Sequence, residues 1–225
     1  MWCVPAIDGE FVARMEDVLR LYARPVDVAA PVICLDERPV VLRDSARVGM
    51  PMAGGRPART DYEYVRNGTA NIFCIVEPKT GRRLTYATKR RTGRDFARAL
   101  LRVAKAYPRA RTIHLVMDNL SSHSEKACIA GLGRRRGRAL WRRFTVHFTP
   151  KHASWLNAAE MEASLVARQC LGKRRIADLA TLRREVRAWR RVATHSGCSI
   201  RWRFRVADAR RVFKYDRLTI PRSEH

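Results

Sequence analysis

The chain has 225 residues, of which 46% are apolar, so it can form one sizeable domain or two small ones and is not a disordered basic tail. Lysine and arginine number 46 against 21 aspartates and glutamates, which leaves a net charge of +25, or one positive charge in nine residues. Charge of this size, spread over the whole chain, favours a nucleic-acid partner over an acidic small molecule or an anionic membrane.

The sequence shows the pattern of neither a membrane span nor a signal peptide. No apolar run approaches the roughly 18 residues of a spanning helix, and the start Met1-Trp2-Cys3 lacks the pattern of a signal peptide. At least 27 residues separate neighbouring cysteines, and no C-x-x-C pair occurs, which argues against a zinc ribbon and a redox motif. We therefore expect a reduced, cytoplasmic protein without structural disulfides or a membrane partner.

The first elements follow from apolar periodicity. Apolar side chains recur at helical spacing over residues 8–23, where Asp8 can cap the helix start and Pro25 stops it. The short apolar run Val32–Leu35 predicts a buried strand that ends at Asp36.

Residues 43–69 are rich in glycine, proline and arginine and predict a long loop. The β-rich segments 71–76 and 84–88 flank a turn at 78–81 and predict a hairpin. The remaining elements expected in chain order are a helix over 95–106, a strand over 112–117, a helix over 124–136, a strand over 144–148, helices over 157–170 and 176–192, and a strand-like segment from 200 followed by a short helix.

Strands that alternate with helices, together with one hairpin, predict an α/β fold with a mixed sheet flanked by helices. We divide the chain into an N-terminal helix leading into the core (1–28), the core itself (29–195) and a basic C-terminal segment (196–225). The arginine clusters at 134–136, 183–184 and 190–191 are expected to be solvated helix faces.

Two aspartates follow apolar runs. Asp36 and Asp118 each come directly after a predicted buried strand, where a charged side chain can reach a cleft. If these two strands are neighbours, the aspartates lie side by side at one edge of the sheet. Either aspartate on its own is also typical of a turn or a helix cap.

A third acid would complete a site for a hard cation. Glu160 is the candidate, although it is also placed to form a capping box with Asn157, and spacing alone does not separate it from Glu162. Carboxylate oxygens are the ligands that Mg²⁺ prefers, and two such ions about 4 Å apart can promote in-line phosphoryl transfer. The pattern favours a nuclease or a strand-transfer enzyme.

Three sequence blocks make the interpretation more specific: Asp61–Thr69 (DYEYVRNGT), Asp118–His123 (DNLSSH) and Thr149–Glu160 (TPKHASWLNAAE). In this order they resemble bacterial insertion-sequence transposases related to the mariner elements, the IS six-thirty group, and the likeness runs from about Trp2 to Tyr215. The resemblance implies an RNase H-like fold with an Asp-Asp-Glu metal triad.

By this resemblance the three catalytic, metal-binding acids are Asp36, Asp118 and Glu160, which decides between Glu160 and Glu162. The implied cofactor is Mg²⁺ or Mn²⁺, as two ions. The implied reaction is cut-and-paste transposition, in which water attacks the transposon end and the freed 3′-hydroxyl then attacks target DNA, at TA in such relatives. The implied partner is DNA, bound by a homodimer.

The resemblance also suggests neighbouring functional residues. Lys151 and His152, just before the third acid, are expected to touch phosphate or order the site, and Asn119 and His123 to support the second acid. His123 is otherwise an ordinary polar helix residue. Four residues are candidates for DNA contact: Arg66, Asn67, Lys151 and His152. For Arg66 and Asn67 the alternative role is to shape the turn before the strand.

The chain departs from this family in one respect. It begins where the catalytic half begins, so we expect it to lack the helix-turn-helix domains that recognise terminal inverted repeats. DNA binding by charge should persist, with an affinity that falls steeply with salt and varies little with sequence. The competing hypotheses are an inactive remnant that coats DNA and an RNase H-like nuclease without strand transfer.

Overall fold

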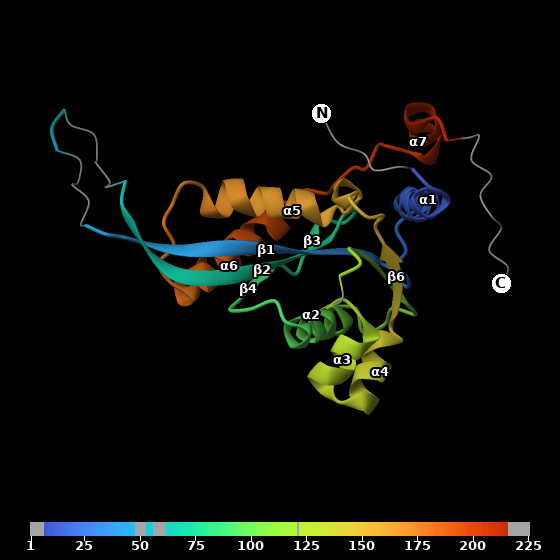
Figure 1. Ribbon diagram of the computed structural model, residues 1–225, viewed down its shortest axis with the longest axis horizontal. Coiled ribbons are helices and arrows are strands. Elements are labelled where there is room, and N and C mark those ends of the chain that lie inside the picture. Colours follow the sequence, from blue (N-terminus) through green and yellow to red (C-terminus); the bar gives the residue numbers. More distant parts are fainter. Residues whose placement is uncertain (1–6, 48–52, 56–61, 121, 216–225) are drawn as a thin grey trace.

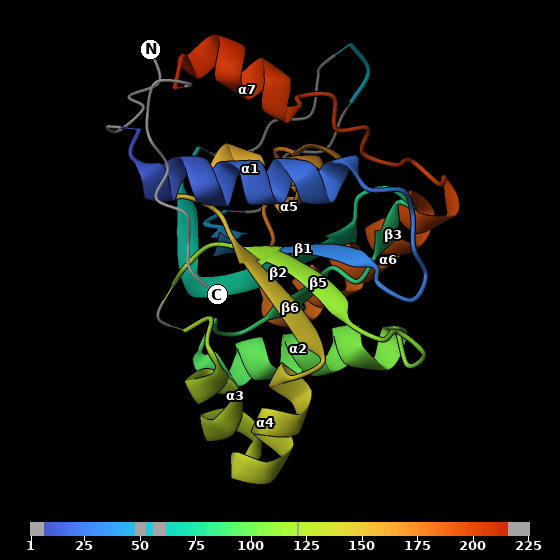
Figure 2. The ribbon, with the colours of Figure 1, turned by 90° about the vertical axis from the view of Figure 1, so that its right-hand side faces the viewer.

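The computed structural model describes residues 7–47, 53–55, 62–120 and 122–215. A six-stranded mixed sheet runs in the order β3-β2-β1-β5-β6, with β4 paired to β2. Helices α1 and α7 lie over one face of the sheet, and α2, α3 and α4 lie over the other (Figure 2). This is the mixed sheet flanked by helices that the alternation of strand and helix patterns predicts.

The strands are β1 (Val32–Ser45), β2 (Tyr64–Glu77), β3 (Arg82–Arg83), β4 (Tyr86–Thr88), β5 (Ile113–Met117) and β6 (Phe144–Phe148). The helices are α1 (Gly9–Ala23), α2 (Gly93–Ala106), α3 (Glu125–Leu132), α4 (Arg134–Trp141), α5 (Ala159–Leu165), α6 (Leu179–His195) and α7 (Val206–Phe213). A 3₁₀ turn, Ser154–Leu156, precedes α5, and a π-helical turn, Val166–Leu171, follows it. β1 pairs antiparallel with β2 and parallel with β5, which is itself parallel to β6.

Successive side chains of β1 point to opposite faces of the sheet and so belong to different hydrophobic clusters. Ile33 and Leu35 pack with the helices α2, α3 and α4 on one face, while Cys34 packs under α1 on the other. Farther along, Val40 and Leu42 pack against the helical region that includes α5 and α6. Both faces of the sheet are therefore covered by helices along this part of β1.

The prediction of a long loop over residues 43–69 is wrong at both ends of this range. β1 continues to Ser45 and β2 begins at Tyr64, so the two form a long hairpin that runs beneath α5 (Figure 1). Contacts between the two strands stabilise this hairpin although its composition is typical of a loop. One such contact is that of the Arg43 guanidinium, which stacks 4.6 Å from the Tyr64 ring centroid. Gly68, with a φ of 97°, lies at the bulge where the register shifts. The segments 48–52 and 56–61 of the predicted loop lie outside the described residues.

Two further expectations are corrected. The helix predicted over 124–136 is split into α3 and α4 by Gly133, whose φ of 83° ends the first helix. The segment after Ile200 is extended but is not a strand, because its alternating apolar side chains meet α1 and α7 instead of a sheet edge. Trp202, for example, packs against Tyr22 with 4.9 Å between ring centroids.

Five of the six cysteines lie in the described part of the chain, and all five are free thiols. Cys34, Cys74, Cys128 and Cys170 are buried and behave as small apolar residues, whereas Cys198 is exposed. Cys3 lies outside that part. Across the described residues, no helix is both long and apolar enough to cross a membrane.

Candidate active site

Asp36 and Asp118 lie at the same level of two neighbouring parallel strands. β1 pairs with β5 so that Cys34 is opposite Val116, and each aspartate comes two residues later. β5 ends at Met117, so Asp118 leaves the sheet, whereas β1 continues through Asp36 into the hairpin. The expectation that a strand ends at Asp36 is therefore wrong, but the condition that the two strands are neighbours is met. Asp36 is partly exposed where its neighbour β5 stops.

Glu160 is brought to the same region by Asn157. The Asn157 side-chain amide donates to the Leu35 carbonyl at 2.8 Å, and its Oδ1 accepts from the Ala159 N–H at 3.1 Å. Asn157 thus binds the first residue of α5 and ties it to the strand residue before Asp36. The Asn157 backbone N–H donates to the Ser154 carbonyl at 2.7 Å, so it is not used for the alternative capping box with Glu160.

The acids influence one another electrostatically. Burial raises the pKa of Asp36 to about 7, although the Glu37 N–H donates to its carboxylate at 2.7 Å and lowers it. The carboxylates of Glu160, Asp118 and Glu37 contribute to the same increase. The negative charges of Glu160 and Asp118 are therefore each close enough to Asp36 to repel its carboxylate.

The carboxylates of Asp36, Asp118 and Glu160 are suitable ligands for a divalent cation, but their side chains do not surround a metal position. Carboxylate oxygens that repel one another are the ligands of a hard cation, which would relieve that repulsion. Within the described ranges, no three histidine, cysteine, aspartate or glutamate side chains are arranged to hold a metal ion. The Asp118 carboxylate instead contacts the Nδ1 atom of His123 at 2.6 Å.

His123 is buried between two carboxylates. Its Nε2 lies 3.4 Å from Glu37 Oε1, on the opposite side of the ring from Asp118, and the ring stacks on Phe96 with 4.6 Å between centroids. Burial lowers the pKa of His123, but hydrogen bonds and charge from Asp118 and Glu37 outweigh it and raise the pKa to about 9. A protonated imidazole thus holds Asp118 at neutral pH. Glu37 was missed at the sequence level because nothing distinguishes it from an ordinary exposed acid.

We predict a pH-dependent stability from this arrangement. The folded-state pKa of His123 exceeds its unfolded value of about 6.5, so its stabilisation is complete below about pH 6.5 and is lost as pH rises through about 9. Urea unfolding with a chelator should show wild type more stable than His123→Gln by up to about 3 kcal/mol at pH 6, with the difference shrinking by pH 10. A difference that does not change with pH would contradict the charged imidazole.

A groove connects the second acid with Lys151 and His152. All three residues, together with Asn119 and the start of α1, line a cavity of about 730 Å³. Lys151 and His152 are exposed, and His152 adopts a φ of 61°. The structure therefore brings these two basic residues to Asp118.

Arg66 and Asn67 do not line this groove. Both are exposed residues within β2, on the hairpin, so the expected turn at this point is replaced by a strand. The Asn67 side-chain amide donates to the Ala177 carbonyl at 3.1 Å, which attaches the hairpin to the segment before α6.

Glu162 has a different environment from Glu160. It is fully buried, and its carboxylate accepts from Arg83 Nε at 2.9 Å and from Thr85 Oγ1 at 2.8 Å. Burial raises its pKa, while Arg83 and Thr85 favour the ionised form. Arg83 also donates to the backbone carbonyls of Gly81, Ala193 and Cys198. Glu162 is therefore committed to a buried network that joins α5 to the sheet.

Comparisons with known proteins give a family and a fold. A family model described as DDE superfamily endonuclease matches residues 31–183. No protein with a curated description matches the chain.

Among solved structures, the Mos1 mariner paired end complex with Mn is similar, with 14% identity, a TM-score of 0.54, and coverage of 87% of this chain and 62% of that one. The Mos1 strand transfer complex and the Mos1 paired end complex with Mg each have 14% identity, a TM-score of 0.52, and coverage of 87% and 61%. The chain thus spans about three fifths of the length of these structures. Their likeness confirms the predicted RNase H-like fold.

Proposed function

Because the chain belongs to the family of DDE superfamily endonucleases, we propose that it is the catalytic core of a mariner-like transposase of the IS six-thirty group. The observation that carries this proposal is the placement of Asp36 and Asp118 at the same level of two neighbouring parallel strands, with Glu160 on the helix that Asn157 attaches to β1. Support for a DNA substrate comes from the Mos1 complexes, which are paired-end and strand transfer complexes.

The proposed reaction has two phosphoryl transfers. In the first, water attacks a phosphodiester at the transposon end and releases a 3′-hydroxyl. In the second, that hydroxyl attacks a target phosphodiester, at TA, and displaces a 3′-oxygen. We propose that a homodimer on DNA performs both steps, in the cytoplasm, where a bacterial chromosome lies.

Asp36, Asp118 and Glu160 would hold the divalent cations, Mg²⁺ or Mn²⁺, as two ions. Such ions activate the attacking oxygen and stabilise the leaving one. The Mos1 paired end complexes with Mn and with Mg support this cofactor class.

The chain's other residues position these acids and the DNA. His123 orients the Asp118 carboxylate, and Asn157 fixes the start of α5 against β1. Lys151 and His152 would contact backbone phosphate across the groove that they share with Asp118. Arg66 would reach DNA from the hairpin, outside the groove, with Asn67 holding the hairpin in place.

The proposal predicts metal-dependent stability. A cation that binds only the folded chain, at 100 times its Kd, should add about 2.7 kcal/mol and raise Tm by roughly 5–10 °C. We expect Mn²⁺ or Mg²⁺ to produce such a shift in wild type, measured by thermal unfolding, and Asp118→Asn to lose most of it. Asp44→Asn, which makes the same change on the exposed part of β1, is the matched control and should keep the shift. An equal shift in Asp118→Asn would contradict the site, and no shift in wild type would favour the remnant that coats DNA.

A further inference from the structure

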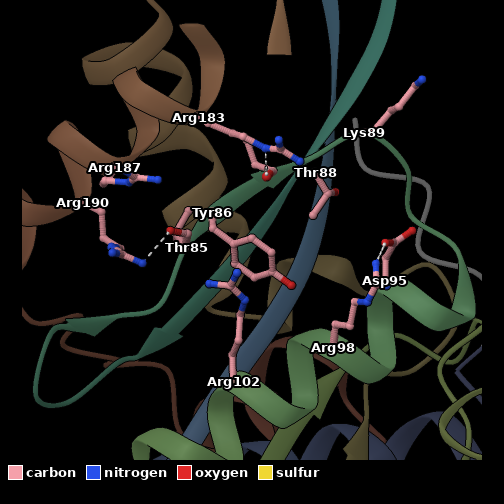
Figure 3. Close-up of a pocket in the computed structure, with 11 residues that line it drawn as sticks. Thr85, Tyr86, Thr88, Lys89, Asp95, Arg98, Arg102, Arg183, Arg187 and Arg190 are labelled. Carbon is pink, nitrogen blue, oxygen red and sulfur yellow. Dashed lines mark hydrogen bonds and ion pairs between the residues drawn. The ribbon is translucent and has the colours of Figure 1, made fainter. Parts of the chain in front are cut away.

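A second cavity, of about 470 Å³, lies along β4 between α2 and α6, and it is strongly basic (Figure 3). Its lining includes six cationic side chains: Lys89, Arg98, Arg102, Arg183, Arg187 and Arg190. The arginines reach toward β4 from the two helices on either side of it (Figure 3). This pocket is separate from the groove at Asp118, with which it shares no lining residue.

The positive charge of this pocket is poorly neutralised. Its lining has one carboxylate, Asp95, which accepts from the Thr92 backbone N–H at 3.1 Å as part of the α2 capping box and lies 3.7 Å from Arg98. Burial lowers the pKa of Arg190, and the guanidinium groups of Arg102, Arg187 and Arg191 lower it further. Like charges are therefore held together here, and an anion would relieve their repulsion.

Local contacts hold several of these cations in place while leaving donors free. Arg183 Nε donates to the Ala87 carbonyl at 3.4 Å, and Arg190 Nη1 donates to the Thr85 carbonyl at 3.5 Å. The Arg102 guanidinium lies 4.1 Å from the Tyr86 ring centroid. Each guanidinium has five N–H donors, so most of them are available to a ligand. The Tyr86 hydroxyl is buried with no hydrogen-bond partner among the described atoms.

The spacing of the arginines favours a row of phosphates over one small anion. Arg183, Arg187 and Arg190 follow one another at four and three residues, so they share one face of α6 over about 10 Å of its length. One DNA strand carries a phosphate for about every 3.4 Å of helix axis. The α6 row therefore spans about three phosphates, and Arg98 and Arg102 face it from α2.

The sheet register relates this pocket to the acids. Tyr86 pairs with Phe73, and Phe73 pairs with Glu37, the residue after Asp36. β4 thus lies two strands away from β1 at the level of the first acid, roughly 10 Å across the sheet. A DNA molecule that is bound at the acids therefore lies close to this edge of the sheet.

We propose that the pocket between α2, β4 and α6 is a second DNA-binding site, which holds backbone phosphates of the DNA that the acids act on. The choice of DNA as the source of the phosphates rests on the proposed function. The pocket itself is defined by the arginines and can be tested without any cleavage.

The test is the salt dependence of duplex DNA binding without divalent metal. Arg98→Gln/Arg187→Gln removes two exposed charges of the pocket, and Arg134→Gln/Arg135→Gln removes two exposed charges from α4 as the matched control. We expect the pocket variant to bind duplex DNA at least about 10-fold more weakly than wild type at low salt. The slope of log K for DNA binding against log salt should become less steep by about 2. Equal changes in both double variants would overturn the proposal. A second pocket variant, Lys89→Gln/Arg98→Gln, repeats the test if the first does not fold.

Two further measurements show whether the phosphates come from DNA or from a free phosphate compound, and whether a failure of the proposed function also affects the pocket. If pyrophosphate raises the Tm of wild type and not of the pocket variant, while both double variants bind DNA alike, the pocket takes a free phosphate compound and the DNA proposal is wrong. If wild type cleaves no DNA with Mn²⁺, the proposed function fails, and the salt slopes still decide the pocket.

Discussion

The Asp36→Asn variant is expected to lose at least about 100-fold of metal-dependent DNA cleavage while unfolding no more easily than wild type in the absence of metal. The loss corresponds to about 3 kcal/mol of transition-state stabilisation, a modest share of what bound metal ions supply. The unchanged or higher stability follows from the environment of this carboxylate. Burial and three neighbouring acids hold its pKa at about 7, so its ionised form destabilises the folded state.

The sign of the effect is set by linkage. The folded-state pKa of Asp36 exceeds its unfolded value of about 3.9, so its stabilising contribution is complete below that value and is lost as pH rises through about 7. At pH 8 with a chelator, the Tm of Asp36→Asn should therefore equal or exceed that of wild type, and Asp44→Asn serves as the matched control. A clear loss of stability, or cleavage at the wild-type rate, would contradict the role of Asp36.

Glu162→Ala is expected to destabilise the chain by about 3–5 kcal/mol, the largest effect on folding that we predict. The substitution leaves the Arg83 guanidinium, whose side chain is 2% exposed, without its carboxylate partner. Urea unfolding measures the loss. Glu10→Ala, which removes the exposed ion pair with Arg14, is the control and should cost no more than about 1 kcal/mol.

The same residue provides a check on the choice of third acid. Glu162→Gln keeps the shape of the side chain, and any folded fraction should cleave DNA with Mn²⁺ as wild type does, because the carboxylate faces Arg83 and Thr85. Loss of cleavage without loss of folding would point to Glu162 as the catalytic acid in place of Glu160.

The sequence was most informative where local patterns decide the structure. The helix with Asp8 as its cap and the strand over 144–148 agree with α1 and β6, because capping and apolar periodicity act within a few residues. The approach of Asp36 and Asp118 could be stated only as a condition, since it depends on a parallel pairing between segments about 80 residues apart.

Features that depend on distant partners could not be predicted from the sequence. The outer parts of β1 and β2 are mostly polar in sequence, and they become strands only because each pairs with the other. The contact of Arg83 with Glu162 joins residues 79 apart in the chain. The arginines of α6 appeared to be an ordinary solvated face, because their proximity to α2 across β4 is a property of the fold.

The most direct test of the central claim is nicking of supercoiled plasmid by the purified chain with Mn²⁺ or Mg²⁺, beside Glu160→Gln. The account predicts that wild type nicks the plasmid only with the metal, and that Glu160→Gln binds the same DNA with unchanged affinity and does not nick it. Nicking by Glu160→Gln at the wild-type rate, or the same nicking with a chelator present, would contradict phosphoryl transfer by Asp36, Asp118 and Glu160.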